Sequence, residues 1–223
     1  MRPFAEIEDL AAARHGGPEA LDARLAAPLA QDALASVPLA AWLEAMAKAV
    51  FQAGFSWSVI NAKWPAMRDA FDGFVPETLA HWHDAHVDAL LKDARIIRNG
   101  AKVQAVIDNA RFLVAWDGET QGGACRTIAA WPVEDQAGLL ALLTTRGTRL
   151  GGTTAQRVCR MVGRDTYILS GDVMKRLRAE GIVTGAATSR TAMAKVQTAF
   201  NQWRAESGRP LTQLSQILAL SIE

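Results

Sequence analysis

The sequence predicts an all-α protein, on three grounds: its composition, its hydrophobic periodicity and its turn residues. Half of the 223 residues are hydrophobic, alanine and leucine dominate, and there is a single tyrosine. β-Branched residues are scattered and form no alternating runs, whereas apolar residues recur at helical steps of three and four. A chain of this length and hydrophobicity is long enough to bury a sizeable core and is not expected to be disordered.

Helices are expected along nearly the whole chain. The clearest covers residues 39–54, whose apolar residues follow the three- and four-residue steps of a core-facing stripe. Those residues are Trp42, Met46, Ala49, Val50 and Ala53. Pro65 and Pro76 each predict a first helical turn, where proline is well tolerated. The last four expected helices cover residues 153–163, 171–180, 188–206 and 210–221.

The chain carries no signal for a membrane or for secretion. No apolar run approaches the ~20 residues that a membrane span requires, and the N-terminal "MRPFAEIEDL" has acids where a secretion signal has an apolar stretch. Cys125 and Cys159 have no metal-ligand spacing and suit a reducing compartment. We therefore expect a cytoplasmic monomer that has no membrane partner and needs no cofactor.

Charge is unevenly distributed, although the net charge is only +1. Residues 1–110 hold ten Lys+Arg against fourteen Asp+Glu, and residues 111–223 hold fourteen against nine, so the two parts carry −4 and +5. The window 146–196 holds ten Lys+Arg and three Asp+Glu. A basic face can bind a polyanion; a solvated helical surface is the alternative.

A helical hairpin is expected at about residues 134–163. The helix in "VEDQAGLLALLTTRG" ends at Gly147, and a second helix begins at Thr153 or Thr154, both acceptable N-caps. The glycines between them permit positive φ, and free N–H groups at the positive end of the second helix can hold a phosphate. The candidate DNA-binding residues are Gly151, Gly152, Thr153, Thr154 and Arg157. Glycines used only for packing of the hairpin are the alternative.

Three further features occur in order along the chain: "FQAGFSWSVI" (51–60), "LLKDARIIRNGAKVQAVIDNARFL" (90–113) and "RGTRLGGTTAQRVCRMVG" (146–163). At matching points the bacterial 3-methyladenine DNA glycosylase I family, in the helix-hairpin-helix glycosylase superfamily, shows "QAG-aromatic/Leu-SW", "AGIIR…K-x-QAIIxNA" and "RGF-x-FVGTT". The chain resembles this family between residues 45 and 165. The resemblance implies a helix-hairpin-helix DNA glycosylase-like helical fold.

The resemblance also implies an activity on double-stranded DNA with alkylated bases. Such enzymes rotate the damaged nucleotide out of the duplex and hydrolyse its N-glycosidic bond, and aromatic faces suit a planar, cationic base such as 3-methyladenine. By resemblance, Trp57 is the tryptophan of the base pocket, and Gln52 to Phe55 form the loop beside the flipped nucleotide. Phe55 could fill the gap left in the stack. Core packing after a helix end is the alternative for Trp57 and Phe55.

The chain departs from the family in its pocket and in its metal ligands. The family has a glutamate that contacts the excised base, three residues before the second glutamine of its motif, and the matching position here is Ala49. Glu44 lies about 140° around the helix from Ala49 and cannot simply replace that glutamate. The family binds zinc through an N-terminal cysteine, a histidine and a C-terminal His/Cys pair, whereas no cysteine here precedes Cys125 and no histidine follows His86. We expect no metal and an altered base specificity.

Two other groups of residues are candidates for a catalytic acid and for a metal site. The segment 165–177 matches the superfamily's catalytic-aspartate motif, but the aspartate position is Ser170. Asp172, two residues later, is a candidate catalytic acid, and a helix N-terminal acid favoured by the dipole is the alternative. A metal-like spacing is formed by His81, His83, Asp84 and His86, with no other feature to support it.

Three functions remain possible for such a chain. The first is a DNA N-glycosylase of base excision repair that excises alkylated purines. The second is a non-catalytic helix-hairpin-helix DNA-binding protein, and the third is a structural interaction protein, against which the basic window and the hairpin argue. For the domains, we expect an N-terminal helical segment at 1–38 and a glycosylase-like domain at 39–223, packed as one compact unit.

Overall fold

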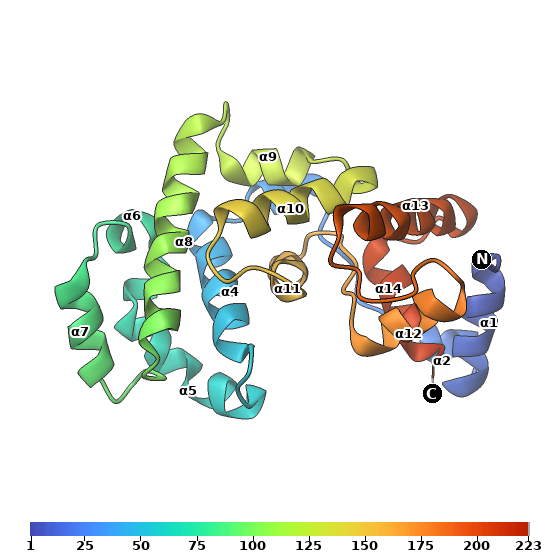
Figure 1. The fold of residues 1–223 in the computed structure, drawn as a ribbon, viewed down its shortest axis with the longest axis horizontal. Helices are drawn as coiled ribbons and strands as arrows, with labels where there is room; N and C mark the ends of the chain where they lie inside the picture. The colour runs from blue at the N-terminus through green and yellow to red at the C-terminus, as the bar shows by residue number, and fades with distance from the viewer. Residues whose placement is uncertain (223) are drawn as a thin grey trace. The chain divides into compact units, whose positions relative to one another are not determined.

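The chain is wholly helical over residues 1–222, which a computed structural model describes (Figure 1). Fourteen α-helices and two short 3-10 helices account for the regular structure of these residues, with no strand among them. The predicted all-α class is confirmed. No helix in this part of the chain is both long and apolar enough to cross a bilayer.

The helices form two compact units. Unit 1 contains residues 1–29, residues 131–139 and the residues from Gly163 onward, and unit 2 contains residues 30–130 and 140–162. This division differs from the expected boundary at residue 38, because residues 1–29 pack with the C-terminal helices. The chain therefore passes between the two units four times, at residues 29–30, 130–131, 139–140 and 162–163.

Unit 1 is held together by contacts between the two ends of the chain. The ring of Phe4 lies 6.2 Å from that of Trp203, and the Trp203 indole N–H donates to the carbonyl oxygen of Arg2 at 3.2 Å. Glu206 accepts a hydrogen bond from the backbone N–H of Phe4 at 2.8 Å. Both Phe4 and Trp203 are fully buried, so this core cannot form from either end alone. The helices of unit 1 are α1 (Phe4–Arg14), α2 (Pro18–Asp22), α12 (Gly171–Ala179), α13 (Arg190–Ser207) and α14 (Leu211–Leu220), with the 3-10 helix η2 (Val133–Asp135).

Unit 2 is organised around α4 (Leu39–Gln52), which packs against α8 (Gly100–Glu119) and α11 (Thr154–Val162). The predicted stripe on α4 is buried at Trp42, Met46, Ala49 and Val50. Each large apolar side chain removed from water in this way contributes roughly 1.5–3 kcal/mol. Ala53 was expected on the same stripe, and this was wrong: α4 ends at Gln52, so Ala53 is extended and exposed.

Further helices pack around this centre. They are α3 (Gln31–Ala35), α5 (Trp57–Ala70), α6 (Pro76–Leu79), α7 (Asp84–Lys92) and α9 (Ala124–Ala130), with the 3-10 helix η1 (Asp72–Phe74). The last helix, α10 (Gln136–Arg146), begins in unit 1 and ends in unit 2. With α11 it makes the predicted hairpin.

Candidate nucleic-acid interface

The turn between α10 and α11 has the conformation that its glycines predicted. Gly147 leaves no room for a side chain, because an added Cβ would lie 2.4 Å from Leu150 Cδ1 and 2.7 Å from the Leu143 carbonyl oxygen. Gly152 is different: the space around it is open, but its φ is +61°, a left-handed conformation that other residues adopt at a cost. Close packing requires a glycine at position 147, and the positive φ of the backbone favours a glycine at position 152.

A buried asparagine fixes this turn to the centre of unit 2. Asn109, on α8, is fully buried. Its side-chain amide donates to the carbonyl oxygen of Thr148 at 3.1 Å, and its Oδ1 accepts from the backbone N–H of the same threonine at 2.7 Å. This pair of hydrogen bonds fixes the position of the Thr148 backbone relative to α8, and so holds the turn in place.

The start of α11 offers unused hydrogen-bond donors. Thr153 occupies the N-cap position, and its carbonyl oxygen accepts from Arg157. Within residues 1–222 no acceptor takes the backbone N–H of Gly152 or Thr153, and Gly151 and Gly152 are exposed. Outward N–H groups at the positive end of a helix are the usual elements of an anion site.

The loop that follows α4 presents two aromatic rings to solvent. Gly54 has a φ of +77° and turns the chain between α4 and α5. Phe55 and Trp57 are then 41% and 46% exposed, and Val59, two residues after Trp57, is 48% exposed. This exposure excludes core packing, the alternative considered for Phe55 and Trp57, because buried rings would be nearly inaccessible.

A lysine that the sequence analysis did not single out anchors this loop. Lys102 is 6% exposed, and its Nζ donates to the carbonyl oxygens of Phe51 at 3.1 Å and Ala53 at 2.6 Å. The same ammonium lies 4.3 Å from the ring centroid of Phe55. Desolvation lowers the pKa of Lys102, and the positive charge of Arg149 lowers this pKa further. No local signal in the sequence indicated this role, because both acceptor carbonyl oxygens lie about fifty residues away in the chain.

We expect Lys102→Met to loosen the loop and destabilise the protein. The variant keeps most of the apolar stem but leaves two carbonyl oxygens without a donor, which costs about 1–3 kcal/mol. Urea unfolding followed by circular dichroism measures this loss. Lys195→Met is the matched control, because Lys195 is exposed on α13 and should change stability by less than about 0.5 kcal/mol. Equal stability of the two variants would contradict the anchoring role.

The hairpin and the aromatic loop meet at one contact. The guanidinium carbon of Arg157, on α11, lies 4.6 Å from the ring centroid of Trp57, at the start of α5. A distance of this size is that of a cation–π contact. Two residues assigned to separate roles by the sequence, a phosphate contact and a base-stacking ring, are therefore neighbours.

The remaining predicted pocket residues lie inside unit 2. Ala49 is 2% exposed and Gln52 is 5% exposed. The Gln52 amide nitrogen lies 3.5 Å from Asn61 Oδ1, and its own Oε1 is buried without a hydrogen-bond partner among the described residues. Glu44 accepts from the Trp64 indole at 2.8 Å and pairs with Arg68 at 3.4 Å. Its carboxylate is thus directed to α5.

The candidate acid of the C-terminal region belongs to unit 1. Ser170 caps α12 by accepting from the backbone N–H of Val173 at 3.3 Å. Asp172, in the first turn of the same helix, pairs with Lys175 at 2.9 Å and is exposed. These contacts favour the alternative for Asp172, a helix N-terminal acid.

Metal ligands do not come together in the structure. Among residues 1–222 no group of three or more His, Cys, Asp or Glu side chains is placed to hold an ion. His83 and His86 cap the start of α7, with their Nδ1 atoms 3.1 Å apart, while His81 lies 2.7 Å from the Glu77 carbonyl oxygen. Burial raises the pKa of Cys125 to about 11, so this thiol is protonated at neutral pH. These residues do not fit the zinc site of the resembled family.

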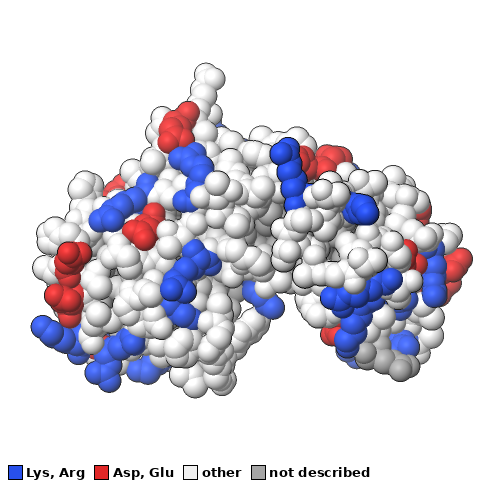
Figure 2. Space-filling model, viewed as in Figure 1, with Lys and Arg blue, Asp and Glu red and all other residues white. Residues whose placement is uncertain are grey.

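Part of the basic window 146–196 is buried or paired within the protein. Arg146 is paired with Glu119 at 2.7 Å, and Arg164 and Arg176 are buried in unit 1. Figure 2 shows lysines and arginines in separate groups on the viewed surface. The count of basic residues in the sequence window overestimates the basic surface, because Arg164 and Arg176 are buried.

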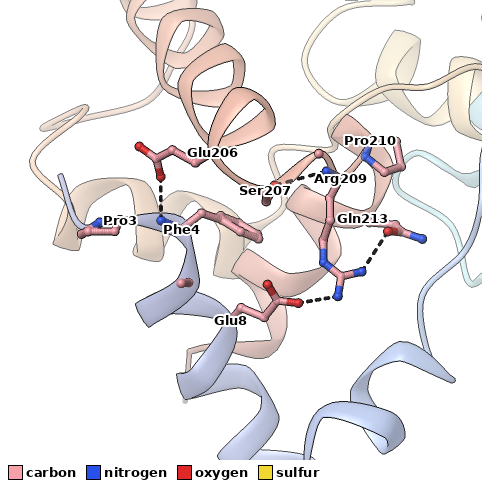
Figure 3. Close-up of a pocket in the computed structure, with 10 residues that line it drawn as sticks. Pro3, Phe4, Glu8, Glu206, Ser207, Arg209, Pro210 and Gln213 are labelled. Atoms are coloured by element: carbon pink, nitrogen blue, oxygen red, sulfur yellow. Dashed lines mark hydrogen bonds and ion pairs between the residues drawn. The ribbon is translucent and has the colours of Figure 1, made fainter.

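A cavity of about 610 Å³ lies in unit 1, and none of its lining residues is a predicted site residue (Figure 3). Its lining includes Glu8, Glu206, Arg209 and Gln213. Arg209 pairs with Glu8, and with Asp22 at 2.8 Å. The Arg209 guanidinium that lines this cavity is thus paired with two carboxylates of the protein itself.

Comparisons with known proteins agree with the resemblance. The family model of the methyladenine glycosylases matches residues 39–131. The "DNA-3-methyladenine glycosylase" of Haemophilus influenzae is 33% identical over 66 residues, 30% of this chain and 36% of the relative. The "DNA-3-methyladenine glycosylase 1" of Escherichia coli is 42% identical over 60 residues, 27% and 32% of the two chains. The matches thus span about a third of the length of each curated relative.

Solved structures share the fold over a larger region. A mutant of 3-methyladenine DNA glycosylase I from Staphylococcus aureus has a TM-score of 0.51 at 20% identity, covering 70% of this chain and 91% of that one. A 3-methyladenine DNA glycosylase I solved in complex with 3-methyladenine gives the same TM-score and coverage at 19% identity. The chain is thus similar to the methyladenine glycosylases over residues 39–131, which are less than half of its length.

Proposed function

We propose that the chain is a DNA N-glycosylase that excises alkylated purine bases from double-stranded DNA, as a step of base excision repair. The nucleotide leaves the stack at a cost of a few kcal/mol, which is smallest for damaged pairs. Water then forms a bond to C1′ as the N-glycosidic bond breaks, and the base departs with the bonding electrons. Alkylation at a ring nitrogen weakens that bond, so the protein has mainly to select and hold the base.

The observation that carries the proposal is the contact between Trp57 and Arg157. It joins an exposed aromatic ring, within the residues 39–131 that match the methyladenine glycosylase model, to the helix that follows the turn at residues 147–153. Stacking of a base on an aromatic side chain contributes about 1–3 kcal/mol. In this proposal Trp57 stacks on the flipped base, and Phe55 enters the duplex to fill the gap that the base leaves.

The hairpin is proposed to hold one phosphate of the DNA backbone. The donors would be the N–H groups of Gly151, Gly152 and Thr153, with the positive charge of Arg157 within the first turn of α11. The Thr154 N–H already donates to the Gly151 carbonyl oxygen at 3.1 Å, so this residue would contribute its hydroxyl. Backbone contacts of this kind carry no base information, so binding should depend little on sequence and should weaken as salt rises.

We expect Gly152→Ala to weaken duplex binding about five- to tenfold. Alanine at a φ of +61° costs about 1–2 kcal/mol, and relief of that strain turns the N–H groups away from the phosphate. Fluorescence anisotropy over a salt series measures the affinity. Gly185→Ala is the control, because Gly185 is exposed, has no positive φ and has open space around it. An affinity indifferent to both salt and Gly152→Ala would refute this role of the hairpin.

The apolar Ala49 bears on selectivity. Without a carboxylate at this position, a base loses one charge-assisted hydrogen bond, typically about 1.5–3 kcal/mol, or roughly one to two decades of discrimination. The protein should therefore distinguish poorly among alkylated purines by hydrogen bonding.

Ala49 also favours a second candidate, a DNA-binding protein that has lost excision. The two candidates share the hairpin and differ in the pocket. Incubating the chain with methylated duplex DNA and measuring released bases by chromatography separates them. Release of alkylated purines supports the glycosylase, and tight binding without any release supports the binding protein.

A further inference from the structure

Arg157 covers an exposed ring that a base would use. Its guanidinium carbon lies 4.6 Å from the centroid of Trp57, and Trp57 is 46% exposed. A base that approaches this indole face must either displace the guanidinium or stack beyond it. In both cases the base lies within a few ångströms of a full positive charge, because arginine stays protonated.

Other cations near the loop reinforce this charge. The Lys102 ammonium lies 4.3 Å from the centroid of Phe55, and Arg149 is close enough to lower the pKa of Lys102. Within residues 1–222 none of Lys102, Arg149 and Arg157 forms an ion pair, although nearby Arg146 is paired with Glu119. The surroundings of the two exposed rings are thus positive and uncompensated.

No carboxylate offsets this field at the predicted pocket position. Ala49 stands there, and the carboxylate of Glu44, on the same helix, is engaged by Trp64 and Arg68. An incoming cationic base would therefore meet repulsion with no acidic partner. An uncharged base would meet only the stacking surface and the polarising effect of the guanidinium.

We propose that Arg157 is a specificity-determining residue that makes this site select uncharged alkylated purines over cationic ones. The inference rests on the proposed glycosylase function, whose substrate class it narrows. Repulsion between two unit charges at about 4–5 Å, in surroundings between water and a protein surface, amounts to at least about fivefold in relative rate. Because Ala49 cannot discriminate between bases by a hydrogen bond, the positive charge of Arg157 is the feature that selects between them.

The test compares two substrates and three Arg157 variants. One duplex contains 1,N6-ethenoadenine, an uncharged alkylated purine. The other is treated with a methylating agent and contains 3-methyladenine, which is cationic within DNA. Single-turnover base release is measured for the unaltered protein, Arg157→Gln, Arg157→Lys and Arg190→Gln. Arg190 is an exposed residue of α13 in unit 1 and controls for the general loss of one positive charge.

The comparison uses each variant's change in rate relative to the unaltered protein, since a cationic base also leaves more easily by itself. Arg157→Gln should raise 3-methyladenine release about five- to tenfold relative to ethenoadenine release. Arg157→Lys, which keeps the charge but not the planar group, and Arg190→Gln should leave the ratio unchanged. A ratio unaffected by Arg157→Gln, with both bases still released, overturns this inference alone. Failure of the unaltered protein to release either base overturns the glycosylase proposal and this inference together.

Discussion

Replacing Trp57 by alanine should reduce release of alkylated bases about a hundredfold while leaving the fold intact. The stacking lost is worth about 1–3 kcal/mol, and its upper range corresponds to a factor of about a hundred in rate. Stability should change little, because the ring is 46% exposed and its close contact is with Arg157. Chromatography of released bases gives the rate, and thermal unfolding gives the stability.

The matched control for this variant is Val59→Ala. Val59 is 48% exposed on the same helix, two residues beyond Trp57 in the first turn of α5. It has no ring on which a base could stack, so its truncation should change release less than about threefold, a difference of about 0.6 kcal/mol. Equal effects of the two variants would show that the patch acts by its apolar area and that Trp57 has no stacking role.

Asn109→Ala should have the largest effect on stability. It removes both hydrogen bonds to Thr148 and leaves the part-buried N–H and carbonyl oxygen of that residue without these partners. Each such group costs about 1–3 kcal/mol, so we expect a loss of about 2–5 kcal/mol. The midpoint of thermal unfolding should fall by about 2–4 °C for each kcal/mol, and duplex affinity should fall as the turn loses its anchor.

A graded series tests this interpretation. Asn109→Asp keeps an acceptor for the Thr148 N–H but loses the donor to its carbonyl oxygen, so its stability should differ from that of the alanine variant. Asn201→Ala removes a side chain that is only part-buried on α13 and should cost less than about 1 kcal/mol. If Asn109→Ala were no more destabilising than Asn201→Ala, the reciprocal pair would not hold the turn.

Local signals predicted the helices well where the cause was local. The four expected helices at residues 153–163, 171–180, 188–206 and 210–221 occur at Thr154–Val162, Gly171–Ala179, Arg190–Ser207 and Leu211–Leu220. Pro76 begins α6 as expected. Pro65 was expected to begin a helix and this was wrong, because α5 starts eight residues earlier at Trp57 and contains the proline in its interior.

Features that depend on partners distant in the chain could not be predicted. Trp57 and Arg157 were both candidates, but 100 positions separate them and nothing in either segment specifies their contact. Lys102 was missed for the same reason, since its two acceptors are carbonyl oxygens about fifty residues away. The division into units also depends on such contacts, because α1 has no sequence signal for its C-terminal partners.

The discontinuous make-up of unit 1 has a consequence for synthesis on the ribosome. Unit 2 has all its residues once Val162 is made, whereas residues 1–29 await the C-terminal helices for their core. At 5–20 residues per second the remaining ~60 residues take roughly 3–12 s. During that time the apolar side chains of Phe4, Ile7 and Leu21, buried in the finished protein, lack their packing partners. We therefore expect chaperones to bind residues 1–29 transiently, until the C-terminal helices of unit 1 have been made.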